Sequence, residues 1–336
     1  MGWSTLKKFK VGLVGAGGVS ELHLEGYKAN PERVSITAIC DPNEEVLHAR
    51  ADKYGIEQRF TDLNDFIQNS GVDVTVVCTP TSIRKQVVLP LLEAGIPLLV
   101  EKPFSDTLSD AIAITEKAKQ LNVPVAVNQN FRRHYPFEIV KNIVAQQTIG
   151  KVTMILFNEM FFRQDAGWRL NQERHALSVM GIHWFDGFRQ ILGCEAESVA
   201  CIMTSSDAIN CKGETDATVQ LRFANGSIVT YTQSFSSRIS RTEMIVIGEK
   251  GTVKCKHNQV ELYLAGDQTP SCIWENHYSR EQNSLDNLEQ LLTWVETGTV
   301  ASNSAEDNLK TVALLDAAYR SAADSQIIRL NSGIKI

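Results

Sequence analysis

The sequence predicts an α/β fold with two domains: an N-terminal, doubly wound parallel sheet and a C-terminal α+β domain built on a mostly antiparallel, open sheet. Three observations support this prediction. Short apolar runs alternate with helical patterns over residues 1–125, and a glycine cluster separates the first run from the first helical pattern. Beyond Gly150, strand-like runs follow one another with hairpin turns between them. The length of 336 residues also suits two domains.

The N-terminal part is expected to consist of βαβ units, because its short apolar runs are separated by helical stretches of ten or more residues. The run 74–77 is almost entirely apolar, as is typical of a parallel strand covered on both faces. The expected strands are 9–14, 34–40, 72–78, 98–100 and 124–127, and the expected helices are 19–29, 44–54, 83–94 and 108–121.

The pattern changes near Gly150, where strands begin to follow strands. Two hairpins are predicted, one at Asn225-Gly226, whose residues tolerate positive φ, and one at 248–251. The expected strands are 152–162, 218–224, 227–235, 242–247 and 252–255, and the expected helices are 175–192, 282–296 and 305–323. We therefore place the domains at 1–128 and 129–336, and the last segment could pack back on the first domain.

Composition excludes several classes of protein. A net charge of −6 without a basic stripe argues against a nucleic-acid partner. No run reaches the roughly 18 apolar residues of a membrane span, and the N-terminus lacks the apolar region of a secretory signal. Seven cysteines form no C-x-x-C pair, which favours free thiols in a reducing compartment. We expect a cytoplasmic protein with no metal, no membrane and no nucleic acid among its partners.

A glycine fingerprint follows the first strand and opens the first helix. Gly15 permits the tight turn, and Gly17 lets the backbone approach a pyrophosphate. Ser20 stands at the third position and is small enough to keep helix and strand close. The free N–H groups of the helix N-terminus then favour a dinucleotide phosphate. The expected cofactor loop is Gly15, Ala16, Gly17, Gly18 and Val19, although an ordinary tight turn would use the same glycines.

Asp41 ends the next strand about 24 residues after Gly17, close to the spacing of a ribose-binding acid in such folds. Its carboxylate can accept hydrogen bonds from both ribose hydroxyls of NAD and would repel the 2′-phosphate of NADP. Arg50 is nine residues further on, in a predicted helix. We therefore expect NAD, with NADP possible. The alternative interpretation of Asp41-Pro42 is a helix N-cap.

Lys102 lies directly after the apolar run 96–100, in the tripeptide Glu101-Lys102-Pro103. A lysine accepts a proton from a hydroxyl if burial or a nearby positive charge lowers its pKa towards neutrality. Its place after a buried strand, downstream of a dinucleotide fingerprint, indicates a proton-transfer group beside a nicotinamide. The alternative is a solvated turn.

Five motifs along the chain form a series. They are, in order, Gly15-Ala16-Gly17-Gly18, Asp41, Cys78-Thr79-Pro80, Glu101-Lys102-Pro103 and Gly181-Ile182-His183-Trp184-Phe185-Asp186. The series resembles that of the glucose–fructose oxidoreductase, inositol dehydrogenase and MocA (Gfo/Idh/MocA) family over nearly the whole chain. The resemblance implies an N-terminal Rossmann domain and a C-terminal α+β domain whose open sheet often forms the oligomer interface. It also implies NAD(P) and a sugar, cyclitol or sugar derivative as substrate.

The resemblance assigns roles to individual residues. Thr79 and Pro80 match the loop along the cofactor, which Glu101 and Lys102 are also expected to border. Lys102 matches the catalytic lysine of the family. Arg132 matches a position that commonly faces the substrate, and His183 matches the histidine beside the reacting hydroxyl.

Two positions depart from the family pattern. Arg84 stands where the family often has His, four residues after the Thr-Pro proline. Val179 stands where many members have an Asp that orients the histidine four residues later, on the same face of a helix. Asp186 could partly substitute for that Asp, and we also count it among the expected substrate-binding residues. His175 is another candidate for the histidine role.

Trp168 and Arg169 lie in an expected loop ahead of the histidine helix. They could contact a sugar by stacking and hydrogen bonding. They could equally hold the loop against the domain.

The sequence therefore predicts an NAD(P)-dependent oxidoreductase that transfers a hydride between nicotinamide and a secondary hydroxyl, with Lys102 and His183 as the catalytic residues. Because the usual Asp is Val179 here, we expect Lys102 to carry more of the proton transfer. Two other functions are open: a redox-neutral, NAD-dependent glycoside hydrolase, and a cofactor-binding sensor with impaired catalysis. The family resemblance implies a homodimer or homotetramer.

Overall fold

The computed structural model describes residues 7–256, 258–276 and 280–330. Its contacts divide the chain into two compact units: unit 1, residues 1–130 and 279–309, and unit 2, residues 131–278 and 310–336. The boundary predicted between residues 128 and 129 stays a prediction. The contacts group the segment 279–309 with the N-terminal part of the chain.

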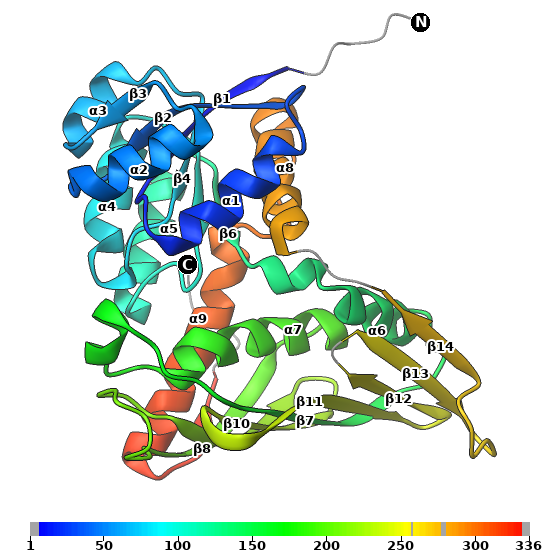
Figure 1. Ribbon diagram of the computed structural model, residues 1–336. Helices are drawn as coiled ribbons and strands as arrows, with labels where there is room; N and C mark the ends of the chain where they lie inside the picture. Colours follow the sequence, from blue (N-terminus) through cyan, green and yellow to red (C-terminus); the bar gives the residue numbers. More distant parts are fainter. Residues whose placement is uncertain (1–6, 257, 277–279, 331–336) are drawn as a thin grey trace, which may run out of the picture. The chain divides into compact units, whose positions relative to one another are not determined.

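Unit 1 is built on a six-stranded sheet in the order β3-β2-β1-β4-β5-β6. Every strand pair is parallel, which confirms the predicted doubly wound sheet, and Figure 1 shows helices beside it. The strand order reverses between β1 and β4, where sheets of this kind bind ligands at the carboxyl ends of their strands. The strands are β1 (Phe9–Val14), β2 (Val34–Cys40), β3 (Gln58–Phe60), β4 (Val74–Val77), β5 (Leu98–Glu101) and β6 (Val125–Asn128). The helices are α1 (Gly18–Lys28), α2 (Glu44–Tyr54), α3 (Leu63–Asn69), α4 (Thr81–Glu93), α5 (Leu108–Leu121) and α8 (Arg280–Thr297).

Strand β3 and helix α3 were not predicted. Strand β3 has the sequence Gln-Arg-Phe, and only Phe60 in it is buried. It therefore carries no apolar run that could mark it in the sequence. Helix α3 has seven residues, of which Phe66 alone is buried.

Local side-chain chemistry sets the ends of the helices in unit 1. The side chains of Asn43, Asp62 and Thr107 accept hydrogen bonds from backbone N–H groups in the first turns of α2, α3 and α5. Gly55 and Asn122 end α2 and α5 in the left-handed conformation, with φ of 65° and 53°.

Helix α8 packs against α1 within unit 1 (Figure 1). The helices approach closely at Gly26, where an added Cβ would lie 2.3 Å from the carbonyl oxygen of Glu281. A buried cation also joins the segments, because Arg33 donates to Glu289 at 3.2 Å and to Glu296 at 2.5 Å. The leucines of α8 in the core of unit 1 are Leu285, Leu288, Leu291 and Leu292.

Unit 2 is built on a nine-stranded sheet in the order β14-β13-β12-β11-β7-β10-β9-β8-β15. Only β10 and β7 pair in parallel, which confirms a mostly antiparallel sheet. Both predicted hairpins are confirmed, and Gly226 has a φ of 88° in the first. The strands are β7 (Val152–Phe162), β8 (Ala196–Thr204), β9 (Asp216–Phe223), β10 (Ile228–Ser234), β11 (Ser236–Gly248), β12 (Gly251–Lys256), β13 (Gln259–Leu264), β14 (Cys272–Glu275) and β15 (Ile328–Arg329). The helices are α6 (Tyr135–Ala145), α7 (Ile182–Leu192) and α9 (Ala305–Asp324), whose first residues belong to unit 1.

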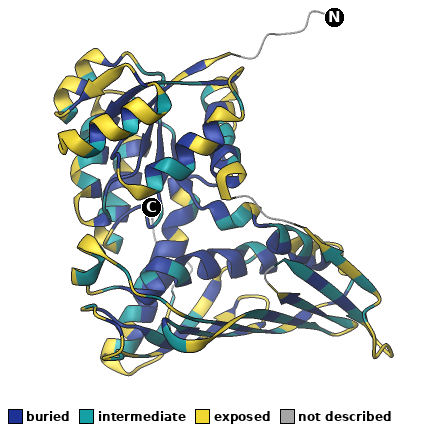
Figure 2. Cartoon of the chain, in the orientation of Figure 1, coloured by how far each residue is buried: buried dark blue, intermediate teal, exposed yellow. Residues whose placement is uncertain are grey.

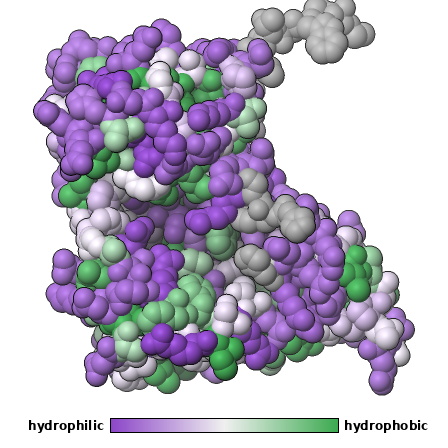
Figure 3. All heavy atoms as spheres, viewed as in Figure 1, coloured by the Kyte–Doolittle hydropathy of each residue, from purple (hydrophilic) through white to green (hydrophobic). Residues whose placement is uncertain are grey.

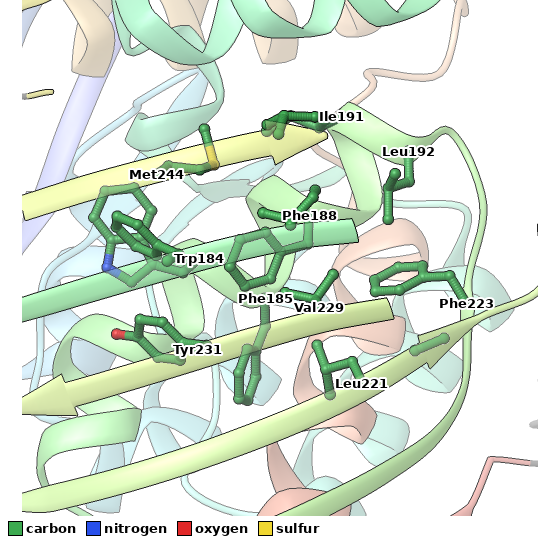
Figure 4. Packing of buried hydrophobic residues seen from close by; sticks show 14 of the residues in the cluster. Trp184, Phe185, Phe188, Ile191, Leu192, Leu221, Phe223, Val229, Tyr231 and Met244 are labelled. Carbon is green, nitrogen blue, oxygen red and sulfur yellow. The ribbon is translucent and has the colours of Figure 1, made fainter. Parts of the chain in front are cut away.

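Helix α7 buries an apolar face against one side of this sheet. Trp184, Phe185 and Phe188 pack with residues of the central strands, such as Tyr231 and Val229 (Figure 4). Helix α7 itself is almost entirely dark blue in Figure 2, which marks buried residues. Strand β9 alternates buried and exposed residues, as expected for a sheet with one face on the core and one face open.

The face of unit 1 that Figure 3 shows is mostly polar. Hydrophilic side chains cover α2 and α3 in the space-filling view (Figure 3). Among the residues that the structure describes, no helix is long and apolar enough to cross a membrane. The seven cysteines are free. Within the described ranges, no group of three or more His, Cys, Asp or Glu side chains could hold a metal ion.

Candidate active site

The turn between β1 and α1 requires glycine at its first fingerprint position. Gly15 has a φ of +97°, and an added Cβ would lie 2.9 Å from the backbone of both Cys78 and Thr79. Its N–H donates to the carbonyl of Cys40 at 2.8 Å. Gly15 therefore packs the turn directly against the end of β4, as the fingerprint predicts.

The surroundings of Gly17 and Gly18 differ from those of Gly15. An added Cβ at Gly17 or Gly18 would meet no atom within 4 Å, so open space lies beside the start of α1. Gly17 is the N-cap of α1, and the N–H groups at the start of the helix follow it. Ser20 is fully buried and donates to the Gly17 carbonyl at 2.7 Å, which keeps the helix close to the sheet. The site fits a bound pyrophosphate.

Asp41 joins the end of β2 to this loop. Its Oδ2 accepts from the N–H of Ala16 at 2.8 Å, and its Oδ1 accepts from the N–H of Asn43 at 2.9 Å. The N-cap of α2 is Asn43, so the interpretation of Asp41 as that cap is wrong. A carboxylate oxygen accepts more than one hydrogen bond. Asp41 can therefore hold the loop and still accept from a ribose.

Arg50 reaches the same loop despite its distance along the chain. Its Nε donates to the Ala16 carbonyl at 3.4 Å, and its Nη1 lies 3.0 Å from Glu21. The positive charge beside the loop is thus paired with a carboxylate of α1. Because the charge of Arg50 is paired with Glu21, the charged group at the end of β2 is the carboxylate of Asp41. A carboxylate at this position fits the expected preference for NAD.

Lys102 lies in a turn directly after β5, here called the Lys102 turn (residues 101–103). The buried carboxylate of Glu101 holds this turn, because its Oε2 accepts from the N–H of Lys102 at 3.1 Å. Its Oε1 accepts from Asn128 at 2.5 Å and lies 2.7 Å from Nε2 of His23. Burial alone would raise the pKa of Glu101, but His23, Lys102 and Asn128 outweigh it and lower the pKa to about 2.

His23 was missed in the sequence. Its ring is fully buried in α1, and its Nδ1 lies 2.8 Å from the hydroxyl of Tyr27, one helical turn later. Burial would lower the pKa of His23, but Tyr27, Cys78 and Glu101 outweigh burial and raise it. The i, i+4 spacing of two polar aromatic residues within α1 was the local signal. The partner Glu101 is 78 residues away, and no sequence pattern marks that contact.

Arg84, noted only as a departure from the family pattern, is buried beneath the same turn. Its Nη1 donates to the carbonyl of Glu101 at 2.6 Å and to the carbonyl of Pro103. Its Nη2 donates to the carbonyl of Thr79. One guanidinium therefore joins the loop after β4 to the Lys102 turn.

Two of the predicted residues of unit 2, His183 and Asp186, lie on α7. His183 is 3% exposed and stacks on Phe131, with ring centroids 4.0 Å apart and an interplanar angle of 18°. Phe131 in turn stacks on His134 at 5.4 Å. The imidazole of His183 is therefore held by aromatic contact.

A turn of π-helix, Leu177–Gly181, precedes α7. The spacing from Val179 to His183 therefore crosses a π turn and is not one ordinary α-helical turn. Val179 packs with Ala176 and Phe235, whereas His183 stacks on Phe131. The expectation that positions 179 and 183 share one helical face stays a prediction.

Arg132 and Asp186, each predicted to bind substrate, are brought together as a bidentate ion pair. Nε and Nη2 of Arg132 lie 2.7 Å and 2.6 Å from the two carboxylate oxygens, and both side chains are buried. Asp186 also accepts from Thr311 at 2.8 Å and lies 3.4 Å from Arg189. The carboxylate of Asp186 is therefore held by three side chains, those of Arg132, Thr311 and Arg189.

His175 is anchored in a second polar cluster. Its Nε2 lies 2.9 Å from Oδ2 of Asp165, and its backbone N–H donates to the carboxylate of Glu214 at 2.9 Å. Burial would raise the pKa of Asp165, but His175 and Arg163 outweigh it and lower the pKa. This cluster fixes the base of the loop 163–175.

Trp168 and Arg169 lie in that anchored loop, in a 3₁₀ turn at Gly167–Asn171. The Arg169 guanidinium lies 4.8 Å from the ring centroid of Trp168. Trp168 is 41% exposed, so its ring presents apolar surface to solvent. The loop is held by Asp165 and His175, and contact of Trp168 or Arg169 with a sugar stays a prediction.

The predicted site residues thus fall into two sets. Unit 1 carries the cofactor loop, Asp41, Thr79, Pro80 and the Lys102 turn. Unit 2 carries Arg132, Trp168, Arg169, His183 and Asp186. Their contacts with cofactor and substrate stay predictions.

Comparison with known proteins identifies both parts of the chain. Residues 9–129 match the model of the GFO_IDH_MocA oxidoreductase family with an NAD-binding Rossmann fold, and residues 137–254 match a GFO/IDH/MocA C-terminal domain. A D-apiose dehydrogenase of Paraburkholderia graminis is 27% identical, over 98% of this chain and 92% of its own. A myo-inositol 2-dehydrogenase of Thermotoga maritima is 26% identical, over 97% and 99%.

Solved structures share the fold over nearly the whole chain. An oxidoreductase from Agrobacterium radiobacter in complex with NAD⁺, L-tartaric acid and magnesium has a TM-score of 0.88 and 25% identity, covering 96% of this chain and 98% of its own. A levoglucosan dehydrogenase complex with NADH and levoglucosan has a TM-score of 0.88 at 19% identity, covering 97% and 100%. Together with the family models, these matches confirm the predicted fold class, the oxidoreductase class and NAD as cofactor.

Proposed function

This chain belongs to the Gfo/Idh/MocA oxidoreductase family, and on that premise we propose that it transfers a hydride between NAD and a secondary hydroxyl of a sugar, cyclitol or sugar derivative. The observation that carries the proposal is the Lys102 turn, which places a lysine at the carboxyl end of β5, in the same sheet as the cofactor loop. The D-apiose and myo-inositol dehydrogenases among its relatives support a polyol substrate.

The N–H groups after Gly17 would hold the pyrophosphate, and Asp41 would accept from the ribose hydroxyls. Thr79 supports this assignment, because its hydroxyl is buried without a hydrogen-bond partner among the described residues. Bound NAD supplies the hydride acceptor.

Lys102 takes the proton of the substrate hydroxyl on its neutral amine while the carbonyl forms. His183 assists as hydrogen-bond partner or second base, since imidazole titrates near neutrality. Arg132, Trp168, Arg169 and Asp186 form the substrate-binding set of this proposal.

The test is NADH formation by the wild-type chain with NAD and a panel of aldoses and cyclitols. Lys102→Ala should lower kcat by a factor of roughly 100 to 10,000, because general-base catalysis contributes about that much. NAD affinity should survive, since backbone groups and Asp41 hold the cofactor. Lys85→Ala, which removes a half-buried lysine paired with Asp110, is the matched control for loss of a lysine. An unchanged kcat in Lys102→Ala would contradict this role, and glycoside cleavage without net NADH would contradict the reaction.

We also propose that the open face of the nine-stranded sheet forms a homodimer or homotetramer contact. Exposed apolar residues support it: Ile202 on β8 is 78% exposed and Ile228 on β10 is 41% exposed. Light scattering after gel filtration gives the oligomeric state. Ile202→Glu should lower it, and a wild-type monomer would contradict the proposal.

A further inference from the structure

We propose that Arg84 is a positioning residue, which fixes the Lys102 turn relative to the loop that follows β4. The inference rests on the proposed function, because it concerns the geometry between the proton-transfer lysine and the loop expected along the cofactor. Arg84 itself is not proposed to touch the substrate.

The contacts of Arg84 identify the two segments that it connects, the Lys102 turn and the loop after β4. Its Nη1 donates to the Glu101 carbonyl at 2.6 Å and to the Pro103 carbonyl, which are the carbonyls on either side of Lys102. Its Nη2 donates to the Thr79 carbonyl, directly before Pro80. A single rigid, planar group thus connects the ends of β4 and β5.

The Glu101 carboxylate also holds the backbone of the Lys102 turn. The N–H of Lys102 donates to the Glu101 carboxylate at 3.1 Å, and Pro103 has no N–H. Together, Arg84 and Glu101 bind the backbone on both sides of Lys102. The direction in which the lysine side chain leaves the turn is therefore set by these two residues.

Burial makes the contacts of Arg84 strong. The residue is 4% exposed, and its guanidinium stays charged at every relevant pH. Hydrogen bonds from a charged donor are about twice as strong as those between neutral groups. A neutral imidazole at this position would donate one N–H, and could not serve three carbonyls.

Position matters here because proton transfer requires the amine within about 3 Å of the hydroxyl. A displacement of roughly 1 Å costs on the order of 100-fold in rate. Loss of Arg84 should therefore act on the chemical step more than on cofactor binding, which depends mainly on the cofactor loop and Asp41.

The experiment compares Arg84→Met, which removes every donor at similar length, with Lys85→Met at the half-buried neighbouring position on α4. We expect Arg84→Met to lower kcat on the order of 100-fold, with a smaller change in the Kd for NAD, and Lys85→Met to match wild type. Methylguanidinium should restore part of kcat to Arg84→Ala and have no such effect on Lys85→Met. A kcat in Arg84→Met equal to that of Lys85→Met would overturn the proposal. The proposal would also be overturned if kcat of Arg84→Ala fell only in proportion to the loss of folded protein and methylguanidinium did not restore it.

A readout independent of turnover separates this proposal from the proposed function. Hydrogen exchange in peptides covering residues 101–106 should speed up in Arg84→Met under conditions in which both proteins are fully folded. If wild type binds NAD but forms no NADH with any polyol, the proposed function fails, while faster exchange there still supports the positioning role. Unchanged exchange in that segment would overturn the positioning role even if wild type is active.

Discussion

In unit 1, the residues predicted to meet the cofactor are held through backbone groups at the ends of strands, whereas in unit 2 the residues predicted to face the substrate are held by other side chains. Gly15 and Lys102 are placed by hydrogen bonds of their own main chain. Arg132 and His183 are placed by an ion pair and by ring stacking.

This difference has a physical consequence. A contact between two main-chain groups, such as that of Gly15 with Cys40, does not depend on side-chain identity, apart from the need for glycine or proline at particular φ angles. A side-chain contact depends on both partners. The glycine turn of unit 1 should therefore be less sensitive to substitution of a distant partner than Arg132 and His183 of unit 2. The Lys102 turn, which the side chains of Arg84 and Glu101 hold, should be as sensitive as the residues of unit 2.

The largest expected effect is the loss of stability when the ion pair of unit 2 is broken. Removal of one partner leaves a buried charge, so Arg132→Met and Asp186→Asn should each lower the free energy of unfolding by about 3–5 kcal/mol. The double variant should lose less than the sum, because it leaves neither charge unpaired. Denaturant unfolding of the four proteins measures the cycle.

The exposed pair Arg133–Glu138 is the matched control, since both side chains are 43% exposed. Arg133→Met should change stability by only about 0–1 kcal/mol. Equal effects at positions 132 and 133 would remove the distinction between the buried and the exposed pair.

The second expected effect is acid sensitivity in unit 1. The pKa of Glu101 is lowered from 4.5 to about 2 by His23, Lys102 and Asn128 against the opposing effect of burial. Because the folded-state pKa is depressed, its stabilisation is present above pH 4.5 and is lost as the pH falls from 4.5 towards 2.

Glu101→Gln should flatten the stability profile in that range, measured by unfolding at stepped pH. Glu173→Gln is the control, because Glu173 forms an exposed ion pair with Lys212 in unit 2. If Glu101→Gln retained the full acid dependence of the wild type, the carboxylate would not be ionised in the network described.

The smallest expected effect concerns a local cap. Asn43→Ala removes the side-chain cap of α2 and should cost about 1 kcal/mol of stability. The variant keeps the backbone N–H of residue 43, which donates a hydrogen bond to Asp41. NAD affinity should therefore not change. Thermal unfolding and an NAD titration measure both, with Glu44→Ala as the neighbouring control. A large loss of NAD affinity would mean that the side chain of Asn43 itself belongs to the site.

Sequence patterns predicted the parallel sheet, both hairpins and the glycine turn, because their signals are local. Apolar runs, Asn-Gly and a glycine before a helix act over a few residues. The same reasoning missed β3, whose Gln-Arg-Phe sequence has no apolar run, and it took 179 and 183 as one α-helical turn apart. The π turn at Leu177–Gly181 has no marker in the sequence that we used.

By itself, the sequence determined the fold class, the glycine turn after β1 and the family, since these depend on residue type and spacing along the chain. Only the tertiary structure decided which side chains support them. His23 meets Glu101, Arg84 meets the carbonyls beside Lys102, and Arg132 meets Asp186 across 78, 17 and 54 residues. Such contacts depend on the packing of whole helices and strands, and a buried polar group reveals its partner only when that packing is known.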